Sequence, residues 1–328
     1  MPNLIQLTHF SLLSILYRLF QEYRPFELPN PNNKDMSAFS DTDFDSNRYS
    51  KSRPSYPQSF YEALSRYHKG NRNILIDVGC GPGTATFQLQ EYLPFDQYVG
   101  CDMSQPMIDT ANGRAQSQNL KNIHFHQGPY QDLSFLKQIG DGKCDMATCV
   151  EAVHWFDLKE FQQVVHDSLN ENGTLAIWGY IDAVLVDYPE FDQYFQDLTY
   201  GDSKMGPYWD QPGKTILRNK YEAVQIDTGL FKDVERHVLT PTDIRKPGFE
   251  ISKEYLPICT TMPLSGLMDY IRTWSGYHNW KHDPANADKM DLVEETLQHI
   301  IDSDNDIDSE SKLVKVAWSS FYIFARKI

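Results

Sequence analysis

Three closely spaced glycines follow an apolar run of the chain. Gly79, Gly81 and Gly83 stand in the segment Asp-Val-Gly-Cys-Gly-Pro-Gly at 77–83. Glycine lets the backbone turn sharply and lets a ligand approach it closely. The third glycine of the dinucleotide fingerprint G-x-G-x-x-G is replaced by Thr84, so the match to a pyrophosphate-binding turn is broken. We therefore expect a loop that binds a ligand without a pyrophosphate.

Asp102 supplies a second group for the same ligand. It ends the next predicted strand, about 20 residues further on, where a carboxylate can accept both hydroxyls of an adenosyl ribose. A glycine loop without phosphate features, combined with a ribose-binding acid, indicates an adenosyl sulfonium compound. Two alternatives remain, a glycine turn required only for packing and a nicotinamide dinucleotide site.

A polar and aromatic group follows the fourth predicted strand, where cofactor and substrate are expected to meet. Its members are Glu151, His154 and Trp155. His154 can hydrogen-bond the substrate or act as a general base. The alternative is a histidine whose hydrogen bonds are satisfied inside the fold.

The elements that must position these residues follow an alternating pattern. From residue 73 onward, short apolar runs alternate with longer mixed segments, which is typical of βαβ units around a parallel sheet. Strands are predicted at 74–79, 98–102, 123–127, 145–150, 174–180 and 234–239, and helices at 84–92, from 104–106, at 263–280 and at 291–301. The run 314–324 predicts an antiparallel edge strand. The predicted fold class is thus α/β, a doubly wound and mostly parallel seven-stranded sheet, Rossmann-like, with an antiparallel C-terminal strand.

Regular alternation ends after the fifth predicted strand. Residues 181–222 are rich in Tyr, Phe, Trp, Asp and Gly, which favours an aromatic-rich insertion over the sheet. We expect 181–222 and 240–312 to form insertions or a lid on the substrate side. Residues 1–35 differ from the rest and are expected to be a disordered or dispensable extension, so that the domain spans 36–328. The alternative for the run 4–20 is a weak amphipathic membrane anchor.

Composition excludes several classes of protein. The net charge is −15, with 30 basic and 45 acidic residues, so the basic footprint of a nucleic-acid binder is missing. The apolar run 4–20 is short and interrupted by polar residues, so we expect no stable membrane insertion. The five cysteines have no zinc-type spacing and their number is odd, which favours a reducing, cytoplasmic compartment. His124 and His126 lack a third ligand, so no metal site is expected.

Several motifs together resemble those of a known family. The glycine loop, Asp102 with Met103 and Met107, and the segment after the fourth strand resemble the class I S-adenosylmethionine-dependent methyltransferases. More narrowly, the chain resembles fungal trans-aconitate methyltransferases from about Met36 to its end. The motifs that carry this narrower resemblance are 46–57, 152–157, 177–180, 206–209 with 211–213, and 272–277.

The resemblance implies a cofactor site for S-adenosyl-L-methionine. The glycines would lie against the methionine part, Asp102 would hold the ribose and Met103 would pack on the adenine. The implied cofactor-binding residues are Asp77, Gly79, Gly81, Gly83, Asp102, Met103, Met107 and Glu151. The acid usually found near the adenine amino group is replaced here by the segment 128–130, so Gln127 or backbone groups would take that role.

The resemblance also implies a small carboxylic acid as the substrate. An anionic acid needs cationic partners, and arginine suits carboxylates through its bidentate fork. The candidates are Arg53, Arg218 and Arg272, with Lys204 and Lys214 behind them. Arg53 and Arg272 rank highest because both lie in aromatic-flanked motifs. Each of these residues can instead be a surface or structural charge.

These observations predict methyl transfer to a carboxylate oxygen of a small acid, giving a methyl ester. Trans-aconitate is the expected acceptor. A carboxylate is already ionised at neutral pH, so this reaction needs no base. One alternative is methylation of a hydroxyl on a toxin or lipid precursor, which requires a base such as His154. The other is a regulatory protein that binds the cofactor without turnover.

Overall fold

The structure is a computed structural model that describes residues 45–250 and 256–328. In these residues, eight strands form one sheet. Their order is β3-β2-β1-β4-β5-β8-β6, and β7 also pairs with β8. The strands are β1 (Ile74–Val78), β2 (Gln97–Asp102), β3 (Ile123–Gln127), β4 (Cys144–Val150), β5 (Leu169–Leu185), β6 (Phe231–Leu239), β7 (Cys259–Pro263) and β8 (Leu313–Lys327). The strands from β3 to β5 run parallel, whereas β8 is antiparallel to β5, β6 and β7.

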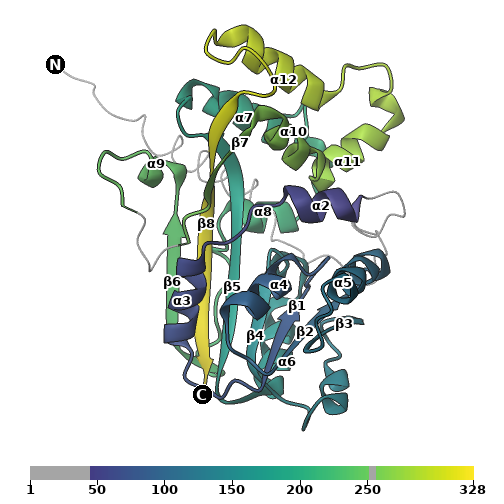
Figure 1. The fold of residues 1–328 in the computed structure, drawn as a ribbon, viewed down its shortest axis with the longest axis vertical. Coiled ribbons are helices and arrows are strands. Elements are labelled where there is room, and N and C mark those ends of the chain that lie inside the picture. The colour runs from purple at the N-terminus through teal and green to yellow at the C-terminus, as the bar shows by residue number, and fades with distance from the viewer. Residues whose placement is uncertain (1–44, 251–255) are drawn as a thin grey trace, which may run out of the picture. The chain divides into compact units, whose positions relative to one another are not determined.

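The central strands are buried throughout because helices cover both faces of the sheet. Every residue of β1 and β4 is buried. Side chains alternate across a strand, so Leu75 joins one core cluster while Ile74 and Ile76 join the other. The first cluster contains residues of α3 (Gln58–Tyr67) and α4 (Thr84–Tyr92), and the second contains residues of α6 (Leu158–Ser168). Figure 1 shows this arrangement, with α5 (Gln105–Ser117) beside α4. The predicted doubly wound α/β fold is confirmed.

The number and place of the C-terminal strands differ from the prediction. The run 314–324 lies inside the sheet, with β5 along one side of β8 and with β6 and β7 in succession along the other. Its nearly continuous burial is typical of an interior strand. The prediction of an edge strand was therefore wrong. The eighth strand, β7, is short and contains two threonines and a proline, so its pattern gave little strand signal.

The predicted helix 263–280 is two helices, α10 (Leu264–Arg272) and α11 (Ser275–His282). Between them, the Thr273 hydroxyl donates to the carbonyl oxygen of Tyr270, and Trp274 has an extended backbone. Side-chain bonds of this kind compete with the helical ladder. The break leaves the Thr273 carbonyl oxygen available to a side chain from elsewhere.

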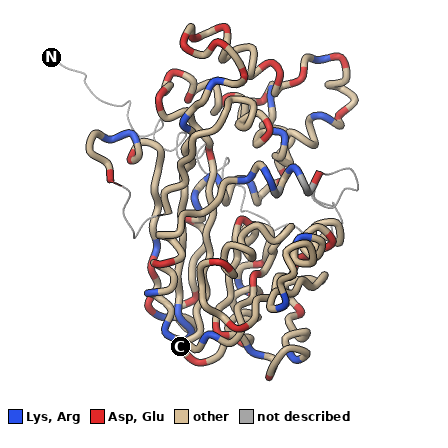
Figure 2. The backbone as a smooth tube through the Cα atoms, viewed as in Figure 1, with Lys and Arg blue, Asp and Glu red and all other residues tan. Residues whose placement is uncertain are grey.

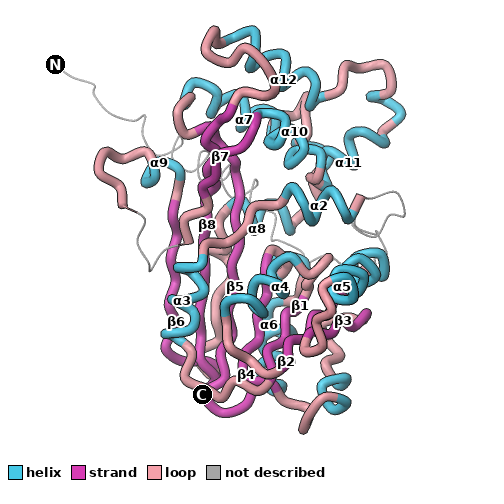
Figure 3. The backbone as a smooth tube through the Cα atoms, in the orientation of Figure 1, coloured by secondary structure: helices cyan, strands magenta, loops and turns pink. Residues whose placement is uncertain are grey.

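The segment 181–222 contains helices and loops in place of a further βα unit (Figure 3). β5 runs on to Leu185, and α7 (Asp192–Tyr200) and α8 (Gly213–Arg218) follow. Among the described residues, the other helices of at least six residues are α2 (Ser46–Ser52) and α12 (Leu292–Ser303). Within the described ranges, no helix is long and apolar enough to cross a membrane. No disulfide joins the five cysteines. The predicted extension 1–35 and the start at Met36 lie outside the described residues.

Candidate active site

The glycine loop connects β1 to α4 and has one open side. Gly79, Gly81 and Gly83 have φ values of 73°, 53° and 79°, which favour glycine over other residues. A Cβ at Gly79 would lie 2.5 Å from the Cβ of Ala152, so this glycine permits close packing inside the protein. A Cβ at Gly81 would meet nothing within 4 Å. The loop therefore presents bare backbone to a ligand at Gly81, as the predicted cofactor site requires.

Asp102 faces this loop from the end of β2. The backbone N–H of Gly81 donates to its Oδ2 over 2.8 Å, and that of Ser104 donates to its Oδ1 over 2.9 Å. A carboxylate has about four acceptor positions, so each oxygen retains one for a ribose hydroxyl. Burial raises the pKa of Asp102 above its usual range, against the effect of the two N–H donors.

Asp77 is buried in β1, two residues before the first glycine of the loop. Its oxygens accept hydrogen bonds from the hydroxyls of Thr86 and Thr148, over 2.7 and 2.8 Å. Burial raises the pKa of Asp77 to about 6. The carboxylate thus connects the end of β1 to α4 and β4 by hydrogen bonds. It stabilises the glycine loop from the side of the protein core.

The two predicted methionines lie on either side of the start of α5. Met103 is 64% exposed, and its carbonyl oxygen accepts a hydrogen bond from Gln127 Nε2 over 3.0 Å. This bond joins the ends of β2 and β3, where an adenine was expected. Met107 is buried on α5.

Glu151 lies directly after β4 and has a positive φ of 56°. Its Oε1 accepts a hydrogen bond from the backbone N–H of Tyr180 on β5. Burial raises the pKa of Glu151 to about 7, although Arg53 and Lys214 act in the opposite direction. The carboxyl group therefore has two cations nearby in a site shielded from water.

Arg53 follows α2 and reaches across to two other elements. Its guanidinium donates to the hydroxyl oxygen of Tyr180 over 3.2 Å and to the carbonyl oxygen of Thr273, at the α10–α11 break, over 3.1 Å. It also lies 4.3 Å from the ring centroid of Tyr49 and 5.4 Å from that of Tyr270. Its Nε is buried and has no hydrogen-bond partner among the described residues.

Lys214, which ranked behind the three arginines on sequence grounds, lies near the start of α8. Its Nζ lies 3.5 Å from the ring centroid of Trp209 on a loop of the aromatic insertion. Burial lowers the pKa of Lys214 to about 7, against the opposing effects of Asp182 and Glu151. We call Arg53, Glu151 and Lys214, which are half-buried, the inner charge cluster, because the charge of each affects the others. Figure 2 shows the basic positions of α8 and the end of α2 close to each other.

Arg218 lies one turn after Lys214 on α8. Its guanidinium carbon is 3.7 Å from the ring centroid of Tyr200, whose hydroxyl donates to Asp182 Oδ1 over 2.5 Å. Arg218 also acts on the charge of Lys214. It is thus connected to the inner charge cluster through an aromatic ring.

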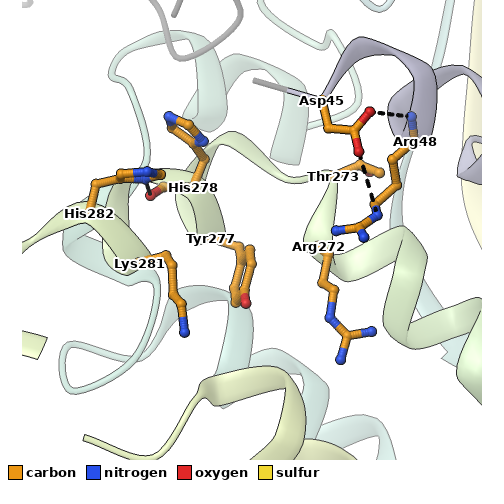
Figure 4. A pocket seen from close by; sticks show the side chains of 8 residues that line it. All are labelled: Asp45, Arg48, Arg272, Thr273, Tyr277, His278, Lys281 and His282. Carbon is orange, nitrogen blue, oxygen red and sulfur yellow. Dashed lines mark hydrogen bonds and ion pairs between the residues drawn. The ribbon is translucent and has the colours of Figure 1, made fainter. Parts of the chain in front are cut away.

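The structure does not bring Arg272 into the inner charge cluster. Its guanidinium pairs with Asp269 at 3.2 Å and with Glu294 on α12 at 2.5 Å. Figure 4 shows it at the wall of a hollow of about 130 Å³, where its side chain extends away from that of Arg48. These ion pairs favour the alternative that Arg272 is a structural charge, and its substitution is a test of that alternative.

His154 is buried, and its Nδ1 lies 2.8 Å from the hydroxyl oxygen of Tyr221. Burial lowers the pKa of His154 to about 3, and Lys214 acts in the same direction. The imidazole is therefore neutral at pH 7 and is a weak base. On β3, the other two noted histidines have separate partners, with His126 stacked on Phe135 and His124 near Gln97.

Known proteins similar to this chain fall in one class. Residues 75–173 match a family model described as a methyltransferase domain. Saccharomyces cerevisiae CRG1, described as a probable S-adenosylmethionine-dependent methyltransferase, is 30% identical over 296 residues, which are 89% of this chain and 98% of CRG1. A protein from Dictyostelium discoideum assigned as a methyltransferase is 24% identical over 86% of this chain and 93% of its own length.

Two further similarities are more limited. Trans-aconitate 2-methyltransferase from Deinococcus radiodurans is 31% identical over 104 residues, which are 31% of this chain and 36% of that enzyme. The solved structure of a protein from Anaeromyxobacter dehalogenans, assigned as a type II methyltransferase, has a TM-score of 0.60 at 18% identity. The similarity covers 84% of this chain and 97% of that one, and it shows the shared fold.

Proposed function

Because this chain belongs to the S-adenosylmethionine-dependent methyltransferases, we propose that its acceptor is a carboxylate oxygen of a small anionic acid. Trans-aconitate is the first acid to test, since the sequence motifs resemble those of enzymes that methylate it. The partial similarity to the Deinococcus radiodurans enzyme supports the same choice. S-adenosylmethionine is the cofactor, and when bound it supplies an electrophilic methyl group.

The inner charge cluster is the observation that carries this proposal. It combines two cations, Arg53 and Lys214, with one carboxyl group, Glu151, beside the expected cofactor site. A buried charge is costly unless it is paired, and the Nε of Arg53 has no partner among the described residues. An acid carboxylate would supply the missing negative charge and hydrogen-bond acceptors.

The residues of the chain would act by binding and orientation. Arg53 and Lys214 would hold the acid so that one oxygen points at the methyl group, at a reacting distance of roughly 3–3.5 Å. The carboxylate is ionised at neutral pH, so no residue needs to remove a proton. A neutral, hydrogen-bonded His154 fits such a reaction. The products would be a methyl ester and S-adenosylhomocysteine.

A hydroxyl acceptor is the second candidate, and one observation favours it. The pKa of Glu151 is raised to about 7, which suits a general base at neutral pH. Such a reaction would give an ether, and it would stop when Glu151 is replaced by Gln.

The test is a screen of the full chain with methyl-labelled cofactor against di- and tricarboxylates, lipids and small alcohols. We expect label in at least one acid, released by mild alkali as esters require. Label only in alkali-stable products would favour the hydroxyl acceptor. Binding of S-adenosylhomocysteine without any labelled product would favour the regulatory alternative.

A further inference from the structure

Lys214 is fixed in place by the close packing of α8 on the segment that follows Glu151. A Cβ at Gly213 would lie 3.2 Å from side-chain carbons of both His154 and Trp155. The backbone N–H of Lys214 donates to the carbonyl oxygen of Asp210 over 3.1 Å. The backbone of Lys214 is therefore closely packed beside the site where we expect cofactor and acceptor to meet.

Aromatic rings surround the ammonium group on one side. Its Nζ lies 3.5 Å from the ring centroid of Trp209, 5.4 Å from that of Tyr200 and 6.0 Å from that of Trp274. Ring faces attract a cation, but they accept no strong hydrogen bonds. An ammonium has three N–H donors, and no bond from the Lys214 ammonium to another described residue is present. The rings hold the charge while leaving its donors available.

We propose that Lys214 determines acceptor specificity by binding one carboxylate of the acid, and that this site takes up a proton when the acid binds. This inference rests on the proposed function, because it assumes an anionic acceptor. Beyond that function, the inference names the residue that selects the acceptor. It also predicts that binding of the acceptor depends on pH.

The proton uptake follows from the charges that face Lys214. These are Asp182 on β5, Glu151 after β4, Arg53 after α2 and Arg218 on α8 itself. In the protein without acid, burial and the two arginines hold the pKa of Lys214 at about 7, so much of the lysine is neutral above that pH. An incoming carboxylate favours the ammonium form and raises this pKa.

Binding of the acid also raises the pKa of the nearby Glu151. Its pKa is already about 7, and a second negative charge beside it would raise the pKa further. Both groups thus bind more protons in the complex than in the free protein. By linkage, affinity for the acid must fall as the pH rises above about 7.

The first experiment compares acid kinetics of the wild type with those of Lys214→Met. Loss of hydrogen bonds to a charged group should raise KM for trans-aconitate, or for the acid methylated fastest in the screen, about tenfold to a hundredfold. The dissociation constant of S-adenosylhomocysteine should change little. Lys246→Met is the matched control, because the exposed Lys246 side chain pairs with Asp243 of α9 (Pro241–Ile244).

The second experiment measures protons directly. Calorimetric titration of the acid into the S-adenosylhomocysteine complex at pH 8, in buffers of different ionisation enthalpy, should show uptake approaching about one proton. Lys214→Arg should retain much of the acid affinity and lose much of the uptake, because arginine stays charged. This variant also guards against a folding defect in Lys214→Met.

The outcomes separate this inference from the proposed function. If the wild type methylates an acid while Lys214→Met keeps its KM, the specificity role is wrong and the function stands. If the acid binds without proton uptake, the pH dependence is wrong. If the wild type methylates no acid, the proposed function fails and the role of Lys214 fails with it.

Discussion

Asp102 illustrates how one carboxylate can serve both the fold and a ligand. It accepts hydrogen bonds from the backbone N–H groups of Gly81 and Ser104, so it shapes the loop on which we expect the cofactor to lie. The acceptor positions that remain on its oxygens suit the two ribose hydroxyls. Its removal should therefore affect the cofactor more than the acceptor.

We expect Asp102→Ala to weaken S-adenosylhomocysteine binding about tenfold to a few hundredfold, since hydrogen bonds to a charged acceptor contribute about 1.5–3 kcal/mol. Titration calorimetry measures this directly. Asp109→Ala is the control, because Asp109 is an exposed residue of α5. Unchanged affinity in a folded Asp102→Ala protein would remove the ribose assignment.

His154 gives a stability prediction with a definite sign. Its pKa is about 3 in the folded protein and about 6.5 in the unfolded chain. The unfolded chain binds more protons between these values, so stability is lost as the pH falls below about 6.5, by about 1.4 kcal/mol per pH unit. Chemical unfolding at pH 7 and pH 5 should show that His154→Gln loses about 2 kcal/mol less than the wild type over this interval.

The same variant tests whether His154 is a base. We expect its kcat to stay within about tenfold of the wild type, which corresponds to less than about 1.4 kcal/mol in the barrier. Loss of all turnover in a folded His154→Gln protein would instead support methylation of a hydroxyl.

At the scale of elements, Arg53 connects three parts of the chain that are distant in sequence. It extends from the end of α2 to Tyr180 on β5 and to the carbonyl oxygen at the α10–α11 break. The site therefore depends on an interrupted helix. A continuous helix over 263–280, as the sequence predicted, would use that carbonyl oxygen in its own ladder.

Two arginine variants test this arrangement. Arg53→Met should raise the acid KM strongly, because loss of one partner of a charge-assisted pair costs about 2–5 kcal/mol. Arg272→Met should leave KM nearly unchanged and cost at most about 1 kcal/mol of stability, since its ion pairs with Asp269 and Glu294 lie near the surface. Steady-state kinetics give the acid KM of both variants, and thermal melting gives their stability. The reverse pattern would move the acceptor site to Arg272.

At the scale of the whole molecule, the features that could be predicted from the sequence are those that depend on a local residue pattern. Parallel strands place their carboxyl ends at one edge, so the glycine loop, Asp102 and Glu151 could be assigned to one site from their order alone. Lys214 was placed only behind the arginines, and the Thr273 carbonyl was not predicted at all. Their positions depend on how the insertion and the α10–α11 pair pack over the sheet, and neither has a local pattern. The interior position of β8 likewise depends on long-range pairing.

The N-terminal segment offers a test at the same scale. The sheet pattern and the family motifs begin after Met36, so a chain that starts there should match the full chain in melting temperature and in methyl transfer. Differential scanning calorimetry and the labelled-cofactor assay provide the comparison. A clear loss in either would show that residues 1–35 belong to the working domain.

The central claim is that the methyl group goes to a carboxylate held by Arg53 and Lys214. Its most direct test is mass spectrometry of the product that the full chain forms from S-adenosylmethionine and trans-aconitate. We predict a monomethyl ester that mild alkali converts back to the acid, and its loss in the Arg53→Met/Lys214→Met double variant while S-adenosylhomocysteine still binds. An alkali-stable product, or undiminished ester formation by the double variant, would contradict the claim.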